Sequence, residues 1–179
     1  MIGEGPLPRR IDTCRPSTAR MYDYWLGGKD NYLVDRGAAA KVQEVFPDVR
    51  RLAWANRAFL VRAVRYLAEQ GVDQFIDIGT GLPTPPNVPE IAREINPGAR
   101  AVGVDNDPIV LAHNRALVAV DDGILTVDGD VRHPGQILAD PELNALIDLD
   151  RPVAVLLVAI LHFVTDDEDP AGIGVSPGP

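Results

Sequence analysis

The chain has 179 residues, of which 46% are hydrophobic and 24% charged, so it is long enough for one domain with a substantial core. Its 26 acidic and 17 basic side chains give a net charge of −9, which would repel a phosphate backbone and argues against nucleic acid as the main partner. A single cysteine, Cys14, excludes an intrachain disulfide and a cysteine-based metal site. With neither a secretory signal nor an apolar run long enough to span a membrane, we expect a cytoplasmic protein.

The N-terminal part is predicted to be a disordered arm followed by helices. Residues 1–16 are rich in proline and charge, and we expect them to be disordered. Potential N-caps at Ser17, Asp35 and Asp48, each followed by a stop signal, predict helices over about 17–27, 35–46 and 48–70. In the third helix, residues at three- and four-residue steps predict an apolar face that packs on a sheet: Leu52, Phe59, Leu60, Ala63, Val64 and Leu67.

From Val72 onward, strand-like and helix-like segments alternate. The pattern predicts strands at 74–78, 101–105, 124–127 and 153–158, and helices at 88–95 and 108–120. Crossovers of this length indicate an α/β fold with a parallel sheet and right-handed connections. The last strand is apolar throughout, which predicts a central position covered on both faces. We therefore expect one domain over 17–173, with helices in 17–70 and the sheet in 72–173, and a divergent tail over 174–179.

Polar side chains follow each predicted strand. In an open parallel sheet, ligands bind beyond the carboxyl ends of the strands, where these side chains should converge. The residues concerned are Asp77, Asp105, Asp128, Asp130 and His162.

A nicotinamide dinucleotide is the weaker interpretation of this edge. The turn at 79–84 lacks the third glycine of the dinucleotide fingerprint. The following helix is not expected to start much before Asn87, which forms a potential capping box with Glu90, so the turn is unusually long. Asp77 would also face an anionic pyrophosphate at close range.

S-adenosylmethionine reverses this electrostatic argument, because it carries an ammonium and a sulfonium and no phosphate. Gly79 and Gly81 would allow close approach of the backbone, and Asp77 would face the amino group. Asp105 is placed for the ribose hydroxyls. Asp130 and the backbone of Val131 would read the adenine, while Thr80 supports the turn. A single strand-end aspartate is as often structural, and Asp107, before Pro108, is better explained as a helix cap.

The stretch YDYWLGGKDNY, residues 22–32, is rich in aromatic residues. Tyrosine and tryptophan faces attract a sulfonium, but Tyr22 and Trp25 also lie on one helix face, as ordinary core residues do. With three further stretches, this one resembles a family of S-adenosylmethionine-dependent methyltransferases, found mostly in actinobacteria and first catalogued as a domain of unknown function. The other stretches are residues 54–84, 104–117 and 148–173.

The resemblance implies a Rossmann-like class I methyltransferase sheet, which usually has the strand order 3-2-1-4-5-7-6. It also implies that residues 22–31 form a lid over the cofactor. Tyr22, Lys29, Asp30 and Asn106 thereby join the expected cofactor contacts.

The chain departs from the family pattern after residue 173, where the C-terminal strands would follow. We therefore expect a truncated chain whose last strand lies at a sheet edge, through which copies could pair. The leading hypothesis is methyl transfer to a small-molecule acceptor, with His162 as the candidate base. The alternatives are an inactive cofactor-binding or interaction module and, third, a dinucleotide-binding protein.

Overall fold

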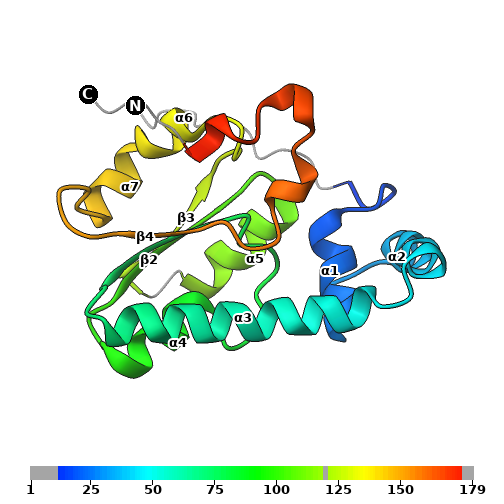
Figure 1. Cartoon of the computed structure of the whole chain (residues 1–179), viewed down its shortest axis with the longest axis horizontal. Coiled ribbons are helices and arrows are strands. Elements are labelled where there is room, and N and C mark those ends of the chain that lie inside the picture. The colour runs from blue at the N-terminus through cyan, green and yellow to red at the C-terminus, as the bar shows by residue number, and fades with distance from the viewer. Residues whose placement is uncertain (1–11, 119–120, 175–179) are drawn as a thin grey trace, which may run out of the picture.

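The computed structural model describes residues 12–118 and 121–174, and these form a parallel sheet between two layers of helices (Figure 1). The four strands are β1 (Gln74–Ile78), β2 (Arg100–Asp105), β3 (Ile124–Asp128) and β4 (Ala154–Leu156). All pairs are parallel, in the order β3-β2-β1-β4. The α/β fold class is therefore confirmed, and this order matches the first part of the one that the resemblance implies.

The helices precede the sheet and then alternate with its strands. Seven α-helices are present among the described residues: α1 (Thr18–Leu26), α2 (Leu33–Val45), α3 (Val49–Glu69), α4 (Val88–Ile95), α5 (Pro108–Val118), α6 (Pro134–Leu138) and α7 (Pro141–Leu146). Three short 3₁₀ turns follow β4: η1 (Leu161–Phe163), η2 (Asp166–Glu168) and η3 (Gly172–Gly174). No helix in the described part of the chain is long and apolar enough to cross a bilayer.

The two faces of the sheet bury separate clusters of apolar side chains. Phe75, Ala101 and Leu156 pack against Leu60 and Val64 of α3 and against α4. On the opposite face, alternate residues of β1, β2 and β3 pack against α6, α7 and the turns after β4: Ile76, Ile78, Val102, Val104 and Val127. Figure 1 shows α3 and α4 below the sheet and α6 and α7 above it, while α1 and α2 lie at one end.

Several helix starts follow the predicted signals. Asp48 directly precedes α3, and at the start of α4 the Asn87 backbone N–H donates to Glu90 Oε2 at 2.7 Å. Asp107 caps α5, because its Oδ1 accepts from the Ile109 N–H at 2.9 Å. The start of α2 was predicted wrongly. The helix begins at Leu33, and Asp35 inside its first turn accepts from the Tyr32 N–H at 2.8 Å.

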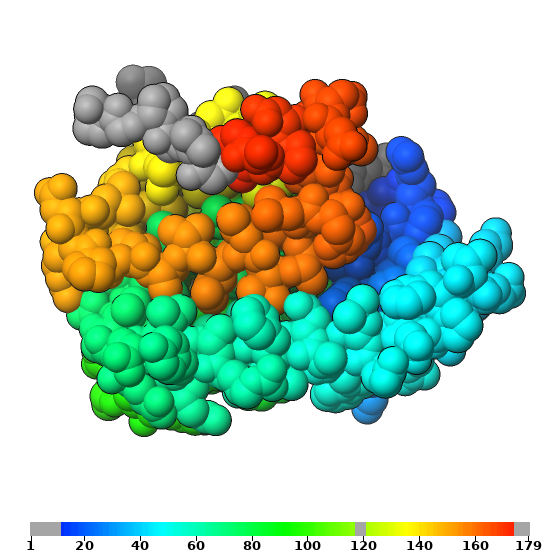
Figure 2. Space-filling model, viewed as in Figure 1, coloured from blue at the N-terminus to red at the C-terminus, as the bar shows by residue number. Residues whose placement is uncertain are grey.

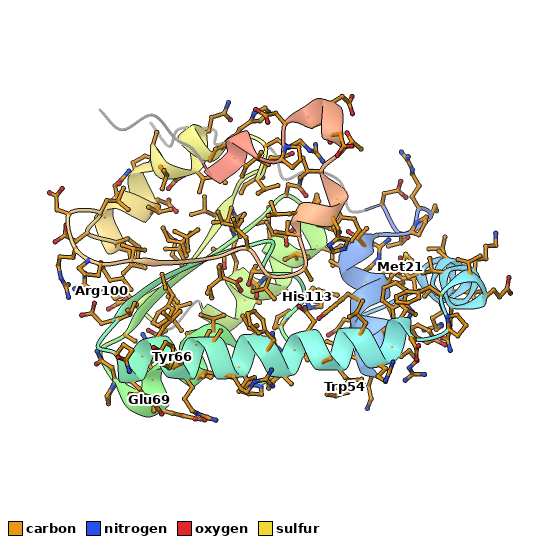
Figure 3. The ribbon with its side chains drawn as sticks, in the orientation of Figure 1. Met21, Trp54, Tyr66, Glu69, Arg100 and His113 are labelled. Atoms are coloured by element: carbon orange, nitrogen blue, oxygen red, sulfur yellow. The ribbon has the colours of Figure 1, made fainter. Side chains whose placement is uncertain are left out.

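The predicted apolar face of α3 is only partly correct. Leu52 is 55% exposed and Phe59 is 52% exposed. The buried positions are Val49, Ala53, Leu60, Val64 and Ala68. Apolar residues occur on several sides of this helix, and the small side chains of Ala53 and Ala68 mark the side that packs closely. Trp54 and Tyr66, labelled in Figure 3, are likewise exposed.

The last strand differs from its prediction in length and position. Only Ala154–Leu156 forms strand, it pairs with β1 alone, and Val155 between them is 52% exposed. Among the described residues β4 therefore lies at the sheet edge and not in a central position. Figure 2 shows this segment and the following turns crossing the molecule directly above α3.

The predicted ends of the domain lie largely outside the described residues. Of the arm expected over 1–16, the structure describes only 12–16, which contact Arg20: its Nη1 donates to the Asp12 carbonyl at 3.3 Å. Of the tail expected over 174–179, it describes only Gly174. The predicted end of the fifth helix, at 119–120, also lies outside the described residues.

Candidate functional site

Asp77 lies in β1, one residue before the strand ends, and is only 8% exposed. Burial raises the pKa of its carboxyl to about 6, although a hydrogen bond with the Thr80 side chain and the nearby Arg57 guanidinium oppose the shift. The neighbouring Asp105 charge adds to it. A carboxylate in this setting lacks full compensation for its charge, so a cation beside it would be stabilised.

The chain after β1 makes a tight turn that requires glycine. Gly79 and Gly81 have φ angles of +76° and +67°, which other residues rarely adopt. A Cβ on Gly79 would also lie 2.8 Å from Ile160 Cδ1, so the segment after β4 packs directly on this turn. Thr80 packs beside Gly103 of β2, where a Cβ would lie 3.1 Å from Thr80 Cγ2. Thr80 therefore supports the turn.

Asp105, at the end of β2, is bonded to the same turn. Its Oδ2 accepts from the Gly81 N–H at 2.9 Å, and its Oδ1 accepts from the Asp107 N–H at 3.0 Å. Burial raises the pKa of the Asp105 carboxyl, and these two N–H groups oppose the shift. The structure thus brings together Asp77, the glycine turn and Asp105, three of the predicted elements.

The other predicted cofactor contacts after β2 and β3 lie at the rim of this edge. Asp130 Oδ2 accepts from Asn106 Nδ2 at 3.2 Å and also pairs with Arg132 Nη1 at 3.2 Å. Asn106 is exposed, whereas the side chain of Val131 is buried in the core under α6 and α7. Asp130 is therefore linked to the end of β2 through Asn106, but Arg132 already shares its charge.

The expected lid is built around a side chain that the sequence analysis did not identify. Asp23 of α1 is 5% exposed, and its Oδ2 accepts from the Asp30 N–H at 3.0 Å and from Asn31 Nδ2 at 2.7 Å. A Cβ on Gly28 would collide with this carboxylate. Lys29 and Asp30 are exposed at the loop surface.

Tyr22 attaches α1 to α3. Its hydroxyl donates to the Ala53 carbonyl at 3.1 Å and accepts from Asn56 Nδ2 at 2.8 Å. These contacts correspond to the ordinary core interpretation of the aromatic stretch. The half-buried Trp25 belongs to the same helix.

His162 lies in η1 and is exposed, and its ring packs on Phe163 with the centroids 4.0 Å apart. His162 comes two residues after Ile160, whose side chain covers Gly79. The chain at His162 therefore lies close to the glycine turn, but the imidazole itself is exposed to solvent.

Arg57 of α3 is the site residue that sequence reasoning missed. Its Nη2 donates to the Thr84 carbonyl and, at 2.6 Å, to the Pro86 carbonyl, so it holds the loop between the glycine turn and α4. Its charge also interacts with Asp77. A signal was present: Arg57 falls between Ala53 and Leu60 at the spacing of the buried face, where a charged side chain is unusual.

A surface hollow of about 600 Å³ adjoins the outer side of the same loop. It is lined by Asp30 of the expected lid, by the loop residues Pro83 and Pro85, and by His113 of α5, which Figure 3 labels. Asp77 and Asp105 do not line this hollow, so it is distinct from the space beside the carboxylates.

These residues suit a cationic nucleoside. A buried and a half-buried carboxylate, both with raised pKa values, lie at adjacent strand ends, with the glycine turn beside them. A diphosphate in this place would meet two anions, whereas an ammonium or sulfonium would offset the cost of burying them.

Comparisons with known proteins agree with this assessment. A family model described as S-adenosyl methyltransferase matches residues 4–176. A candidate methyltransferase from Thermobifida fusca YX shares 45% identity over 89% of this chain, with a TM-score of 0.85. A DUF574 family protein from Streptomyces avermitilis MA-4680 shares 46% identity over 92% of this chain, with a TM-score of 0.87. No curated protein matches.

The chain spans less than two thirds of either solved neighbour, covering 61% of the first and 64% of the second. The family match nevertheless includes the whole described sheet, with Asp77, the glycine turn and Asp105. This chain therefore belongs to the S-adenosyl methyltransferase family, whose cofactor is S-adenosylmethionine.

Proposed function

We propose that this chain binds S-adenosylmethionine at the carboxyl ends of β1 and β2 and takes part in methyl transfer to a small-molecule acceptor. The observation that carries the proposal is the hydrogen bond from the Gly81 N–H to Asp105 Oδ2, at 2.9 Å. It joins the glycine turn to the acidic end of β2, beside the buried Asp77.

Each residue has a separate task in this proposal. Asp77 pairs with the ammonium of the cofactor, and Asp105 accepts from its ribose hydroxyls. Gly81 leaves room for the ligand against the backbone, while Gly79 gives the turn its shape beneath Ile160 and Thr80 supports it. The adenine end lies toward Asn106, Asp130 and Val131, and the expected lid contributes Tyr22, Lys29 and Asp30.

When bound, S-adenosylmethionine would supply the methyl group of its sulfonium; an acceptor would attack that methyl carbon in line, and S-adenosylhomocysteine would leave. The chain contributes positioning and exclusion of water, since Ile160 packs over Gly79 and the buried Asp77 holds the ammonium. An acceptor that must lose a proton needs a base. His162 is our candidate, and its exposed imidazole would have to turn toward the site.

A small acceptor fits the charge of the molecule better than a nucleic acid does, because the net charge is −9. The exposed, unpaired Cys14 fits a reducing cytoplasm. Cofactor binding without turnover is the second candidate function, because this chain spans only 61% and 64% of the two solved neighbours.

Titration calorimetry with S-adenosylmethionine and S-adenosylhomocysteine tests the proposal. We expect Asp105→Ala to weaken binding by more than tenfold, because a hydrogen-bond acceptor with a full charge is lost. Asp128→Ala is the matched control. Asp128 ends β3, pairs in register with Asp105 of β2 and is exposed. Equal binding by the wild type and Asp105→Ala would refute the site. Methyl release over a set of acceptors then separates an enzyme from a binder.

A further inference from the structure

The amino-acid end of S-adenosylmethionine poses a charge problem for the proposed site. Its ammonium and carboxylate are attached to one carbon, so both must be accommodated within a few ångströms of each other. Asp77 and Asp105 attract the ammonium, but they repel the carboxylate. A cationic side chain near Asp77 would therefore favour binding of the whole zwitterion.

Arg57 of α3 is a cation within electrostatic range of Asp77. The Arg57 guanidinium lowers the pKa of Asp77, and in return the Asp77 charge raises that of Arg57 against the effect of its own burial. Arg57 Nη2 is engaged by the carbonyls of Thr84 and Pro86, and Asn87 Oδ1 lies 3.5 Å from it. The Arg57 side chain is thus fixed to the loop that follows the glycine turn.

The hydrogen bonds that Arg57 makes to the described residues all come from Nη2, so the donors on Nε and Nη1 are left over. Arg57 Nε is buried and has no hydrogen-bond partner among the described residues. Buried N–H groups without an acceptor are rare and costly in native proteins, and a charged donor more so than a neutral one. A ligand acceptor that reaches this donor would remove the cost.

We propose that Arg57 binds the carboxylate of the cofactor's amino-acid end through its unused Nε–H, while Asp77 pairs with the ammonium. This assignment rests on the proposed function and adds the half of the amino-acid end that Asp77 cannot hold. Guanidinium is well suited to the task, because it stays charged when half-buried and presents donors in a planar fork that matches a carboxylate. The carbonyls of Thr84 and Pro86 fix its plane before the ligand arrives.

Two ligands separate carboxylate binding from a purely structural role. S-adenosylhomocysteine has the amino-acid end, whereas 5′-methylthioadenosine has the same nucleoside and lacks it. Calorimetric titration of both is run on the wild type, Arg57→Met and Arg57→Lys. Arg62→Met is the control, since Arg62 is an exposed arginine on the same helix. Thermal unfolding of each variant shows that it is folded.

For Arg57→Met we expect S-adenosylhomocysteine to bind roughly 10- to 100-fold more weakly, the effect of losing a hydrogen bond between charged groups. Binding of 5′-methylthioadenosine should change by less than about threefold, which is under 1 kcal/mol. Arg57→Lys should recover part of the loss, and Arg62→Met should show none. If Arg57→Met does not fold, Arg57→Lys carries the same comparison of the two ligands.

Two results would overturn the inference. If both ligands weaken by the same factor, Arg57 only anchors the loop; if S-adenosylhomocysteine binds unchanged, Arg57 does not contact it. A wild type that binds neither ligand would instead refute the proposed function and the inference together.

Discussion

Replacing Asp77 with asparagine should change the pH dependence of folding. The carboxyl has a pKa of about 6 in the folded protein against an ordinary value of 3.8, so its burial as an anion opposes folding increasingly as the pH rises from 3.8 through 6. Each pKa unit corresponds to about 1.4 kcal/mol, which gives ~3 kcal/mol in all. Well below pH 4 the carboxyl is protonated in both states and this cost is absent. Because the unfolded carboxyl is already partly ionised at pH 4, the wild type should lose about 2.5 kcal/mol of this relative to Asp77→Asn between pH 4 and pH 8.

Urea unfolding of both proteins at several pH values between 4 and 8 measures this difference. Any constant cost of burying the new amide cancels, because only the change with pH is compared. Asp128→Asn serves as the control, since Asp128 is an exposed carboxylate at the end of β3. If the difference in unfolding free energy between Asp77→Asn and the wild type is constant with pH, or increases as the pH falls, ionised Asp77 does not oppose folding.

Three further predictions concern parts of the fold around the site. Arg20→Met should destabilise the protein by about 3 kcal/mol in urea unfolding, because Arg20 forms a fully buried ion pair, whereas removal of the exposed Arg51 pair should cost less than about 1 kcal/mol. Gly79→Ala should cost about 3 kcal/mol and Gly81→Ala about 1 kcal/mol, since both strain the backbone but only the first meets a neighbouring side chain; equal losses would contradict this. Finally, we expect copies of the chain to associate through the edge of β4 and Val155→Lys to reduce the effect in sedimentation at increasing concentrations. A sedimentation coefficient independent of concentration in the wild type would contradict it.

The fold was predictable because its signals are local. Each strand of the sheet is a short apolar run that ends on a polar residue or a turn, and Asn87 and Glu90 mark the start of α4 within three residues of each other. The convergence of Asp77 and Asp105 follows from parallel pairing alone, since it brings successive strand ends to one edge. No distant contact had to be known for either result.

The rest depended on packing between distant segments. The sequence does not show which side of α3 faces the sheet, because leucine, phenylalanine and tryptophan also occur on its exposed side. The spacing of Arg57 marked it as unusual, but its role could not be assigned, because its partners Thr84 and Pro86 lie 27 and 29 residues away. The apolar run around β4 correctly indicated burial of Ala154 and Leu156. Periodicity cannot say whether another element packs over the side chain of Val155, which points to the opposite face.

The contacts of α1 limit how a lid could move. Ser17 Oγ, just before the helix, donates to Asp107 Oδ2 at 2.5 Å, and this ties the helix to the start of α5. On the other side, Tyr22 is bonded to the Ala53 carbonyl and to Asn56 of α3. Opening by rotation of α1 would break both attachments. Movement that leaves them intact is confined to the loop around Lys29 and Asp30, where Asp23 holds the backbone by only a few hydrogen bonds. A lid in this protein would therefore work as a short loop beside a fixed helix.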